Sequence, residues 1–410
     1  MPWPWNKVSP MNLREEFVLS ALEPRACMAK LCRQFGISRQ NGYKWVRRYR
    51  EEGIEGLRDQ SRRPLGSRIQ ASGEVVLQVL ELRQRRGWGP KKLQELLKRK
   101  LRRKGQDAVV PSMRTIARII ARGGYVKKRR RLALPAGRAT EAPAPHVEAS
   151  NDLWTVDFKG WWRAQDGERC EPLTVRDAHS RYVLRAALLG STATKVVRPE
   201  FQRLFERFGL PKAILSDNGS PFACTSAPCG LSELSAWWVS LGIQVIHSRP
   251  GCPQDNGGHE RVHVDMLNLE RASAPSRQAQ QVLCDDWQRE FNHVRPHEAL
   301  AMKTPAQVYR PNAQRPTPKL VTHRYPKGAV LRKVLSNGHF WWHGRSLFLS
   351  RSVRGYSVAL VCPPGQRLAT IMFHHLALGQ LDLEGGAKVQ PLAEENRHPP
   401  LPQQAAAIAA

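Results

Sequence analysis

The positive charge of this 410-residue chain is concentrated in its first third, and this limits how the chain can divide into domains. Residues 1–140 carry 34 basic and 11 acidic side chains, a net charge of +23, whereas the other 270 residues carry 31 and 24, a net charge of +7. Such a local surplus indicates a region that binds a polyanion, joined to a more neutral region. Nucleic acid is the first candidate. At roughly 150 residues per domain, the length predicts two to four domains.

Several classes of protein are disfavoured by what the sequence lacks. No stretch longer than fifteen residues is free of Asp, Glu, Lys and Arg, which excludes a membrane helix of about 20 apolar residues. The first residues lack the apolar segment of a secretory signal. The eight cysteines include no CxxC pair, which predicts neither a disulfide framework nor a zinc ribbon. We therefore expect a cytoplasmic, reduced protein with no membrane partner.

A first DNA-binding domain is predicted at residues 10–65, from three helical segments. Pro24 suits the start of the second helix, and Ser38 is a good N-cap for a third helix that Gly53 ends. Helix, short glycine-containing turn and helix is the helix-turn-helix arrangement. A small helical bundle with a basic surface gives the same pattern, but the charge favours DNA. The third helix would then present to DNA the side chains of Arg39, Gln40, Asn41, Lys44 and Arg47.

The helical pattern recurs at residues 66–130, which we interpret as a second helix-turn-helix-like domain with a basic linker to residue 149. Helices are predicted at Glu74–Arg86, from Lys91, and from Ser112 to the glycines at 123 and 124. The linker begins with a run of basic residues. Such runs are most often solvated surface, but between DNA-binding elements we interpret this one as a set of phosphate contacts: Lys127, Lys128, Arg129, Arg130 and Arg131.

The rest of the chain changes character. Short strand patterns alternate with amphipathic helices over residues 150–312, which predicts an α/β domain with a central mixed sheet. Residues 319–390 are rich in strand and turn signals, which predicts a small β-barrel-like domain. The tail at 391–410 is biased toward Pro, Gln and Ala, and we expect it to be disordered.

Three carboxylates in the α/β domain form a candidate metal site. Asp157 interrupts an apolar strand pattern, where a carboxylate is costly unless it is paired or binds a metal. Asp217 follows the strand pattern at Ala213–Leu215, and Glu260 opens a helix. Singly, Asp217 is typical of a turn residue and Glu260 of a helix N-terminus. Together, beside a cationic region, they favour Mg²⁺ or Mn²⁺ held by oxygen ligands.

The chain resembles the DDE transposases of bacterial insertion sequences, whose catalytic core is similar to that of retroviral integrases. Five segments in order carry the resemblance: Trp154–Gly160, Asp177–Tyr182, Leu215–Phe222, Pro253–Arg261 and Phe291–Leu300. The resemblance implies a ribonuclease-H-like fold for residues 150–312 and metal-binding, catalytic roles for Asp157, Asp217 and Glu260. We expect Asn218, Asn256, His259 and Arg261 to support these three residues, and Asp177 to shape a turn between strands.

The resemblance also implies a reaction, a cofactor and partners. The reaction is hydrolysis of a phosphodiester at the end of the element, followed by attack of the freed 3′-OH on target DNA. It would use two divalent metal ions, Mg²⁺ or Mn²⁺. The partners would be double-stranded DNA, as terminal inverted repeats and target, and at least one further copy of the chain. The protein would then be found at the bacterial nucleoid.

Two other functions remain as alternatives. His259-Glu260-Arg261-Val262-His263 matches the HExxH pattern of zinc metalloproteases, although that function leaves Asp157 and Asp217 unexplained. A DNA-binding regulator with an inactive core would bind DNA without cutting it.

Compared with related integrases, the spacing between Asp217 and Glu260 is long, and we interpret Ala223–Trp238 as a surface insertion.

Overall fold

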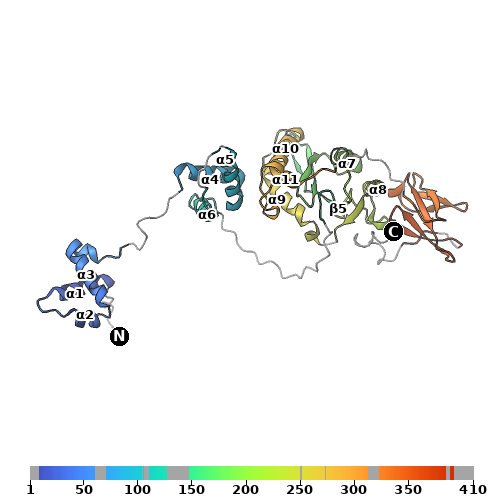
Figure 1. The fold of residues 1–410 in the computed structure, drawn as a ribbon. Helices are drawn as coiled ribbons and strands as arrows, with labels where there is room; N and C mark the ends of the chain where they lie inside the picture. The colour runs from blue at the N-terminus through green and yellow to red at the C-terminus, as the bar shows by residue number, and fades with distance from the viewer. Residues whose placement is uncertain are drawn as a thin grey trace, which may run out of the picture. The chain divides into compact units, whose positions relative to one another are not determined.

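A computed structural model describes residues 9–60, 71–103, 105, 110–126, 147–249, 252–272, 274–312, 323–384 and 388–391. These fall into two compact units, Met1–Val76 and Leu77–Ala410 (Figure 1). The predicted basic run at 127–131 and all but the first residue of the predicted tail lie outside the described residues. The predicted domain boundaries therefore remain predictions.

The N-terminal unit packs three helices around a small core. Its elements are α1 (Pro10–Leu22), α2 (Met28–Gln34), α3 (Arg39–Glu52) and the 3-10 helix η1 (Gly53–Leu57). The predicted caps of α3 are confirmed, because Ser38 Oγ accepts from the backbone N–H of Asn41 and Gly53 ends the helix with φ 63°. Pro24 lies in the turn before α2 rather than in its first turn. Arg25 there has φ 79°, which a helix cannot contain.

Three further helices follow: α4 (Gly73–Arg86), α5 (Pro90–Arg103) and α6 (Met113–Arg122). Their starts and ends agree with the predicted pattern, and Ser112 Oγ caps α6 by accepting from the N–H of Thr115. The buried residues are Leu93 and Leu97 of α5 and Ile116 and Ile120 of α6, each pair four positions apart, whereas most of the basic side chains of both helices lie in exposed or half-buried positions.

A mixed sheet forms the centre of the second unit, as predicted. The strand order is β4, β3, β1, β5, β6. Strand β3 runs antiparallel to both β4 and β1, and β5 and β6 run parallel to β1. The strands are β1 (Leu153–Phe158), β2 (Trp162–Arg163, paired with the start of β3), β3 (Arg169–Asp177), β4 (Val183–Leu189), β5 (Ala213–Ser216) and β6 (Gln244–His247).

Helices cover both faces of this sheet (Figure 1). The helices are α7 (Thr194–Phe208), α8 (Glu233–Ser240), α9 (Gly257–Arg271), α10 (Arg277–His293) and the short α11 (Pro305–Val308). Aromatic residues of α7 and α8, such as Phe201 and Trp238, pack with Trp154 on one face. On the other face, Met266 of α9 and Phe291 of α10 are buried in a separate cluster. The side chain of Asp157 contacts α9, so it belongs to this second face.

Helix α10 covers the free edge of strand β4 with amide side chains. Asn292 accepts from the N–H of Val183 and donates to its carbonyl, at 2.9 and 2.8 Å. Gln288 donates to the carbonyls of Val183 and Leu184, and Gln281 accepts from the N–H of Leu188. Edge strands present unpaired backbone groups, and here side chains of one helix satisfy them.

Replacement of Asn292 by Ala should therefore destabilise the domain. The side chain is buried, and its loss leaves the backbone N–H of Val183 without its acceptor. An unsatisfied buried group costs about 1–3 kcal/mol, so we expect the free energy of unfolding in urea to fall by that amount. Gln202→Ala on the exposed face of α7 is the control. If both variants lowered the free energy of unfolding by the same small amount, this role for Asn292 would be contradicted.

The segment Ala223–Trp238 is not a surface insertion. It contains the 3-10 helix η2 (Pro228–Gly230) and most of α8, in which Leu234, Trp237 and Trp238 are buried in the main core. The opposite side of α8, with Ala236 and Val239, packs against the C-terminal strands. The added length therefore joins two cores.

The C-terminal part is β-rich, as predicted, but closure into a barrel is not confirmed. Among the described residues the strands form an open four-stranded sheet, in the order β12-β11-β10-β7, and a two-stranded hairpin, β8-β9. The strands are β7 (Val330–Lys333), β8 (His339–Trp342), β9 (Arg345–Phe348), β10 (Ser357–Val361), β11 (Leu368–Phe373) and β12 (Leu376–Asp382).

None of the helices in the described part of the chain combines the length and apolar character that a bilayer crossing requires.

Candidate active site

The register of two parallel strands places Asp157 beside Asp217. Strands β1 and β5 pair Leu153 with Ala213 and Thr155 with Leu215, a constant offset of residue numbers. Asp157 lies two residues beyond the last of these pairs, and Asp217 directly follows the end of β5, so the same offset would set the two side by side. Residues opposite each other in neighbouring strands point to the same face of a sheet, so both carboxylates lie on the side covered by α9.

The third carboxylate, Glu260, lies in the first turn of α9, and two neighbours fix that turn against β1. His259 is buried, and its Nε2 lies 3.0 Å from the carbonyl oxygen of Thr155. Asn256 Nδ2 lies 3.5 Å from the carbonyl of Val156. Glu260 itself is exposed, and its charge acts on Asp157 together with that of Asp217.

The electrostatics of the two aspartates fit a cation. Burial, then the charges of Asp217 and Glu260, raise the pKa of Asp157 to about 7. The Oδ1 atom of Asp217 is buried and has no hydrogen-bond partner among the described residues. A buried carboxylate oxygen without a donor is costly. A divalent cation held by these carboxylates would offset both this cost and the cost of burying the charge of Asp157. The donor set therefore fits the predicted metal.

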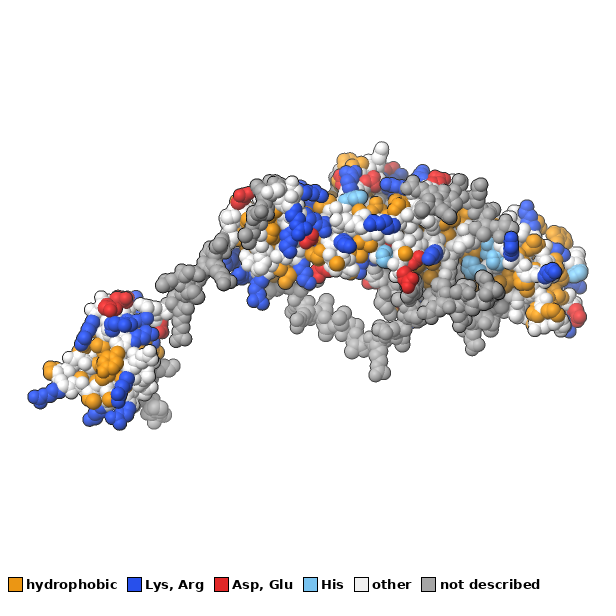
Figure 2. All heavy atoms as spheres, viewed as in Figure 1, with side chains coloured by type: hydrophobic (Ala, Val, Ile, Leu, Met, Phe, Trp, Pro, Cys, Tyr) orange, Lys and Arg blue, Asp and Glu red, His pale blue; other side chains and the backbone are white. Residues whose placement is uncertain are grey.

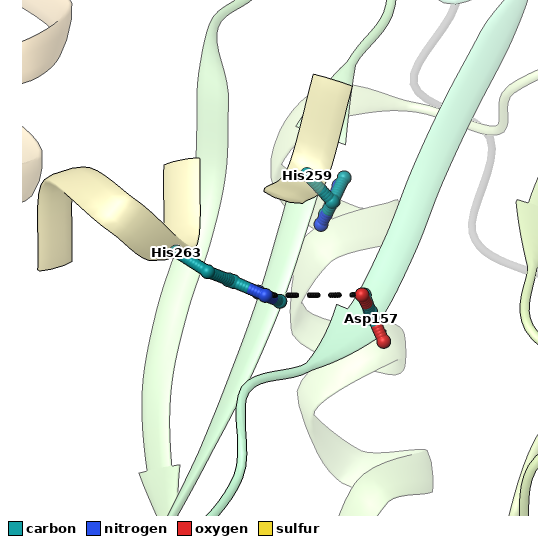
Figure 3. Close-up of side chains that lie close together, drawn as sticks. All are labelled: Asp157, His259 and His263. Carbon is teal, nitrogen blue, oxygen red and sulfur yellow. Dashed lines mark ion pairs between the residues drawn. The ribbon is translucent and has the colours of Figure 1, made fainter. Parts of the chain in front are cut away.

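Two histidines of α9 flank Asp157 (Figure 3). His263 points toward Asp157, with Nδ1 3.8 Å from Oδ2. His259 and His263 also share the hydroxyl of Thr174, at 3.1 Å from His259 Nδ1 and 3.0 Å from His263 Nε2. Burial lowers the pKa of His259 well below its ordinary value, and burial together with Lys159 lowers that of His263 to about 4. Both rings are therefore neutral at pH 7.

This geometry does not match a zinc protease. In the HExxH pattern both histidines bind one metal. Here both ring nitrogens of His259 are engaged, one by the carbonyl of Thr155 and one by the hydroxyl of Thr174. Only His263 has a ring nitrogen facing a carboxylate.

The other predicted supporting residues have mixed surroundings. Asn218 Nδ2 donates to the carbonyl of Ser248 and thereby ties the loop after β5 to the end of β6. Arg261 is exposed and points away from the buried side of α9. Asp177 shapes a turn, as predicted, because its carboxylate accepts from the N–H groups of Asn151 and Ser180.

Sequence reasoning missed Arg176, Thr174 and the role of His263 toward Asp157. Arg176 is almost completely buried, and burial lowers its pKa to about 10. It lies against Gly258, where an added Cβ would come within 2.2 Å of its Nη1. The sequence did contain a signal for His263. It lies three positions after Glu260, and residues three apart on a helix share a face. Nothing local distinguishes Arg176 or Thr174.

Gly258→Ala should therefore disturb the start of α9. The new methyl group would overlap the guanidinium of Arg176, and overpacking of this kind costs about 1–3 kcal/mol. We expect a lower melting temperature and weaker Mn²⁺ binding, measured by calorimetry. Gly257→Ala is the matched control, because an added Cβ there meets no atom within 4 Å. Equal effects of the two variants would contradict the role of close packing at Gly258.

The predicted DNA-contacting side chains of α3 are all exposed: Arg39, Gln40, Asn41, Lys44 and Arg47. Their helix is fixed by the buried Gly42, where an added Cβ would lie 2.6 Å from Cys32 Sγ. Lys and Arg side chains are spread over the visible face of the N-terminal unit (Figure 2). This surface has the charge that a DNA backbone requires.

Comparison with protein families agrees with this organisation. Residues 13–64 match a helix-turn-helix domain and residues 41–120 a homeodomain-like domain. Residues 147–253 and 241–305 match two models of an integrase core domain. The matches define a class of protein, in which helix-turn-helix segments precede an integrase core.

Relatives come from mobile elements. The chain is 31% identical over 187 residues to "Insertion element IS476 uncharacterized 39.2 kDa protein" of Xanthomonas euvesicatoria, which covers 44% of this chain and 50% of that protein. It is 28% identical over 178 residues to an IS136 insertion-element protein of Agrobacterium fabrum, covering 40% and 85%. A solved structure of the HTLV-2 integrase catalytic core domain in complex with magnesium aligns over 40% of this chain and 98% of that one, at 17% identity and a TM-score of 0.29. The chain thus contains helix-turn-helix segments and an integrase core domain, and it is similar to insertion-element proteins over part of its length.

Proposed function

We propose that this chain is a metal-dependent DNA transposase that binds the terminal inverted repeats of its element, hydrolyses a phosphodiester there and joins the freed 3′-OH to target DNA. The observation that carries the proposal is that Asp157, near the end of β1, and Asp217, directly after the parallel neighbour β5, lie at the same end of the sheet, where Glu260 opens α9. The orphaned oxygen of Asp217 supports it.

The chain's residues divide the work as follows. Asp157, Asp217 and Glu260 hold divalent ions, Mg²⁺ or Mn²⁺, which when bound supply Lewis-acid activation of water and stabilise the leaving oxygen. The exposed side chains of α3 contact DNA bases and backbone. The basic run at 127–131 adds phosphate contacts with a strong salt dependence. Two element ends require at least two copies of the chain.

The test uses the full chain with labelled element-end DNA, in Mg²⁺ or Mn²⁺ against EDTA. We expect binding in all conditions and 3′-end cleavage or strand joining only with metal. Binding without cleavage in either metal would favour the DNA-binding regulator. Absence of binding would overturn the assignment of the helices at 10–65 and 66–130 to DNA.

A further inference from the structure

We propose that His263 is a nitrogen ligand of the metal held by Asp157, and that His259 is a positioning residue which does not touch the metal. The proposal rests on the proposed function for the existence of a metal at Asp157, and it goes beyond the three carboxylates. The ligand atoms of Asp157, His259 and His263 all lie within 4.8 Å of one another. The direction of the hydroxyl proton of Thr174 distinguishes the roles of the two histidines.

The argument begins with His259. Its Nε2 faces the carbonyl oxygen of Thr155 at 3.0 Å, and a carbonyl can only accept, so Nε2 carries a proton. The ring is completely buried, where an unpaired charge is costly, so the ring carries a single proton. The Nδ1 atom is therefore an acceptor, and the hydroxyl of Thr174, 3.1 Å away, must donate to it.

The hydroxyl of Thr174 has only one proton. It also lies 3.1 Å from the carbonyl oxygen of Asp157, which can only accept. That oxygen already has a backbone donor, and a Thr174 proton pointed at either acceptor is not available to His263 Nε2. On either side of Asp157 along β1, the backbone N–H of Ala178 donates to the carbonyl of Leu153, and the N–H of Lys159 donates to the carbonyl of Pro172. Because hydrogen-bonded pairs alternate along an antiparallel ladder, Asp157 and Thr174, which pair in the β1–β3 register, form one of these pairs.

The tautomer of His263 follows from that of His259. With its proton directed to His259, Thr174 Oγ1 can only accept from His263 Nε2, 3.0 Å away, so Nε2 carries the proton of this neutral ring. Nδ1 then presents a lone pair to Asp157 Oδ2 at 3.8 Å. At 3.8 Å the two atoms are too far apart for a hydrogen bond, and a cation between them would take a lone pair from each.

The separation also fits a shared ion. Two ligand atoms that each lie about 2.1 Å from a metal can be at most about 4.2 Å apart, and 3.8 Å is within this limit. Mg²⁺ keeps oxygen ligands and several waters, whereas imidazole nitrogen is a ligand of transition metals. The Asp157–His263 pair thereby biases the site toward the transition metal.

The test measures metal ligation rather than activity. Mn²⁺ is bound to the full-length protein, and pulsed electron paramagnetic resonance detects nitrogen coupled to the metal. We expect a nitrogen coupling in the wild type that is lost in His263→Gln and retained in His179→Gln, a histidine control in the turn after β3. The Mn²⁺ dissociation constant of His263→Gln should rise roughly 10–100-fold, and that for Mg²⁺ by less.

Two further samples separate the possible failures. Wild-type protein labelled with [15N]histidine should show the coupling of 15N in place of 14N, which keeps the test valid if His263→Gln does not fold. Asp157→Asn should lose Mn²⁺ binding. If Mn²⁺ binds in an Asp157-dependent way without nitrogen coupling, the metal site stands and the role of His263 is overturned. If Mn²⁺ does not bind, both the metal site and the ligand role fall.

Discussion

Asp217→Asn is expected to reduce metal-dependent cleavage of element-end DNA by at least about 1,000-fold, or about 4 kcal/mol of activation free energy. The substitution keeps the shape of the side chain but removes the charge that offsets a divalent cation. Its Oδ1 atom is buried and without a partner, so few other contacts depend on it. The measurement is the single-turnover cleavage rate in Mg²⁺ and in Mn²⁺.

A matched control makes the result specific. Asp286→Asn removes a carboxylate from the exposed side of α10, where it pairs with Arg289, and exposed ion pairs contribute little. This variant should cleave at the wild-type rate. DNA binding by Asp217→Asn should also be unchanged, because α3 is in the other unit. Cleavage by Asp217→Asn within about tenfold of wild type would refute a metal-binding role for this residue.

Asp157→Asn is expected to stabilise the metal-free protein at pH 8 while abolishing metal binding. Burial and the neighbouring carboxylates raise the pKa of Asp157 to about 7 in the folded state, against an ordinary value of 3.8. The folded state therefore holds this proton more tightly than the unfolded state. Its stabilising contribution is complete below pH 3.8 and is lost as the pH rises through 7.

At pH 8 the charged Asp157 therefore lowers the free energy of unfolding of the metal-free protein, and Asn removes this destabilisation. We expect the free energy of unfolding in EDTA to rise by about 1–3 kcal/mol at pH 8, with a smaller gain at pH 5. Added Mn²⁺ should stabilise the wild type and leave the variant unchanged. The measurement is thermal unfolding of the Leu77–Ala410 unit within the full chain. A gain of equal size at pH 5 and pH 8 would show that packing, rather than charge, is responsible.

The sequence predicted features that depend on nearby residues. Ser38 and Gly53 bound α3 because capping chemistry is local, and the strand at Leu153–Phe158 follows from its apolar pattern. The three carboxylates were found from their residue types and flanking turns. Their assignment to one metal site remains a prediction that the geometry supports.

Features that depend on distant partners were not predicted. The lone pair of His263 follows from Thr174, 89 positions away in the chain. Helix α8 was taken for an insertion because the C-terminal strands that cover its second side lie about 100 residues further on. The open sheets of the C-terminal part depend on register between strands, which composition does not fix.

The amide side chains that cover strand β4 also have a consequence for synthesis of the protein. The bonds from α10 to β4 join residues 93 to 109 positions apart. At about 5–20 residues per second, the ribosome needs roughly 5–20 s to make the intervening segment. During that interval the nascent chain exposes an edge that can pair with another strand. Chains that stop before residue 293 should therefore aggregate, and slow translation between β4 and α10 should lower the yield of folded protein.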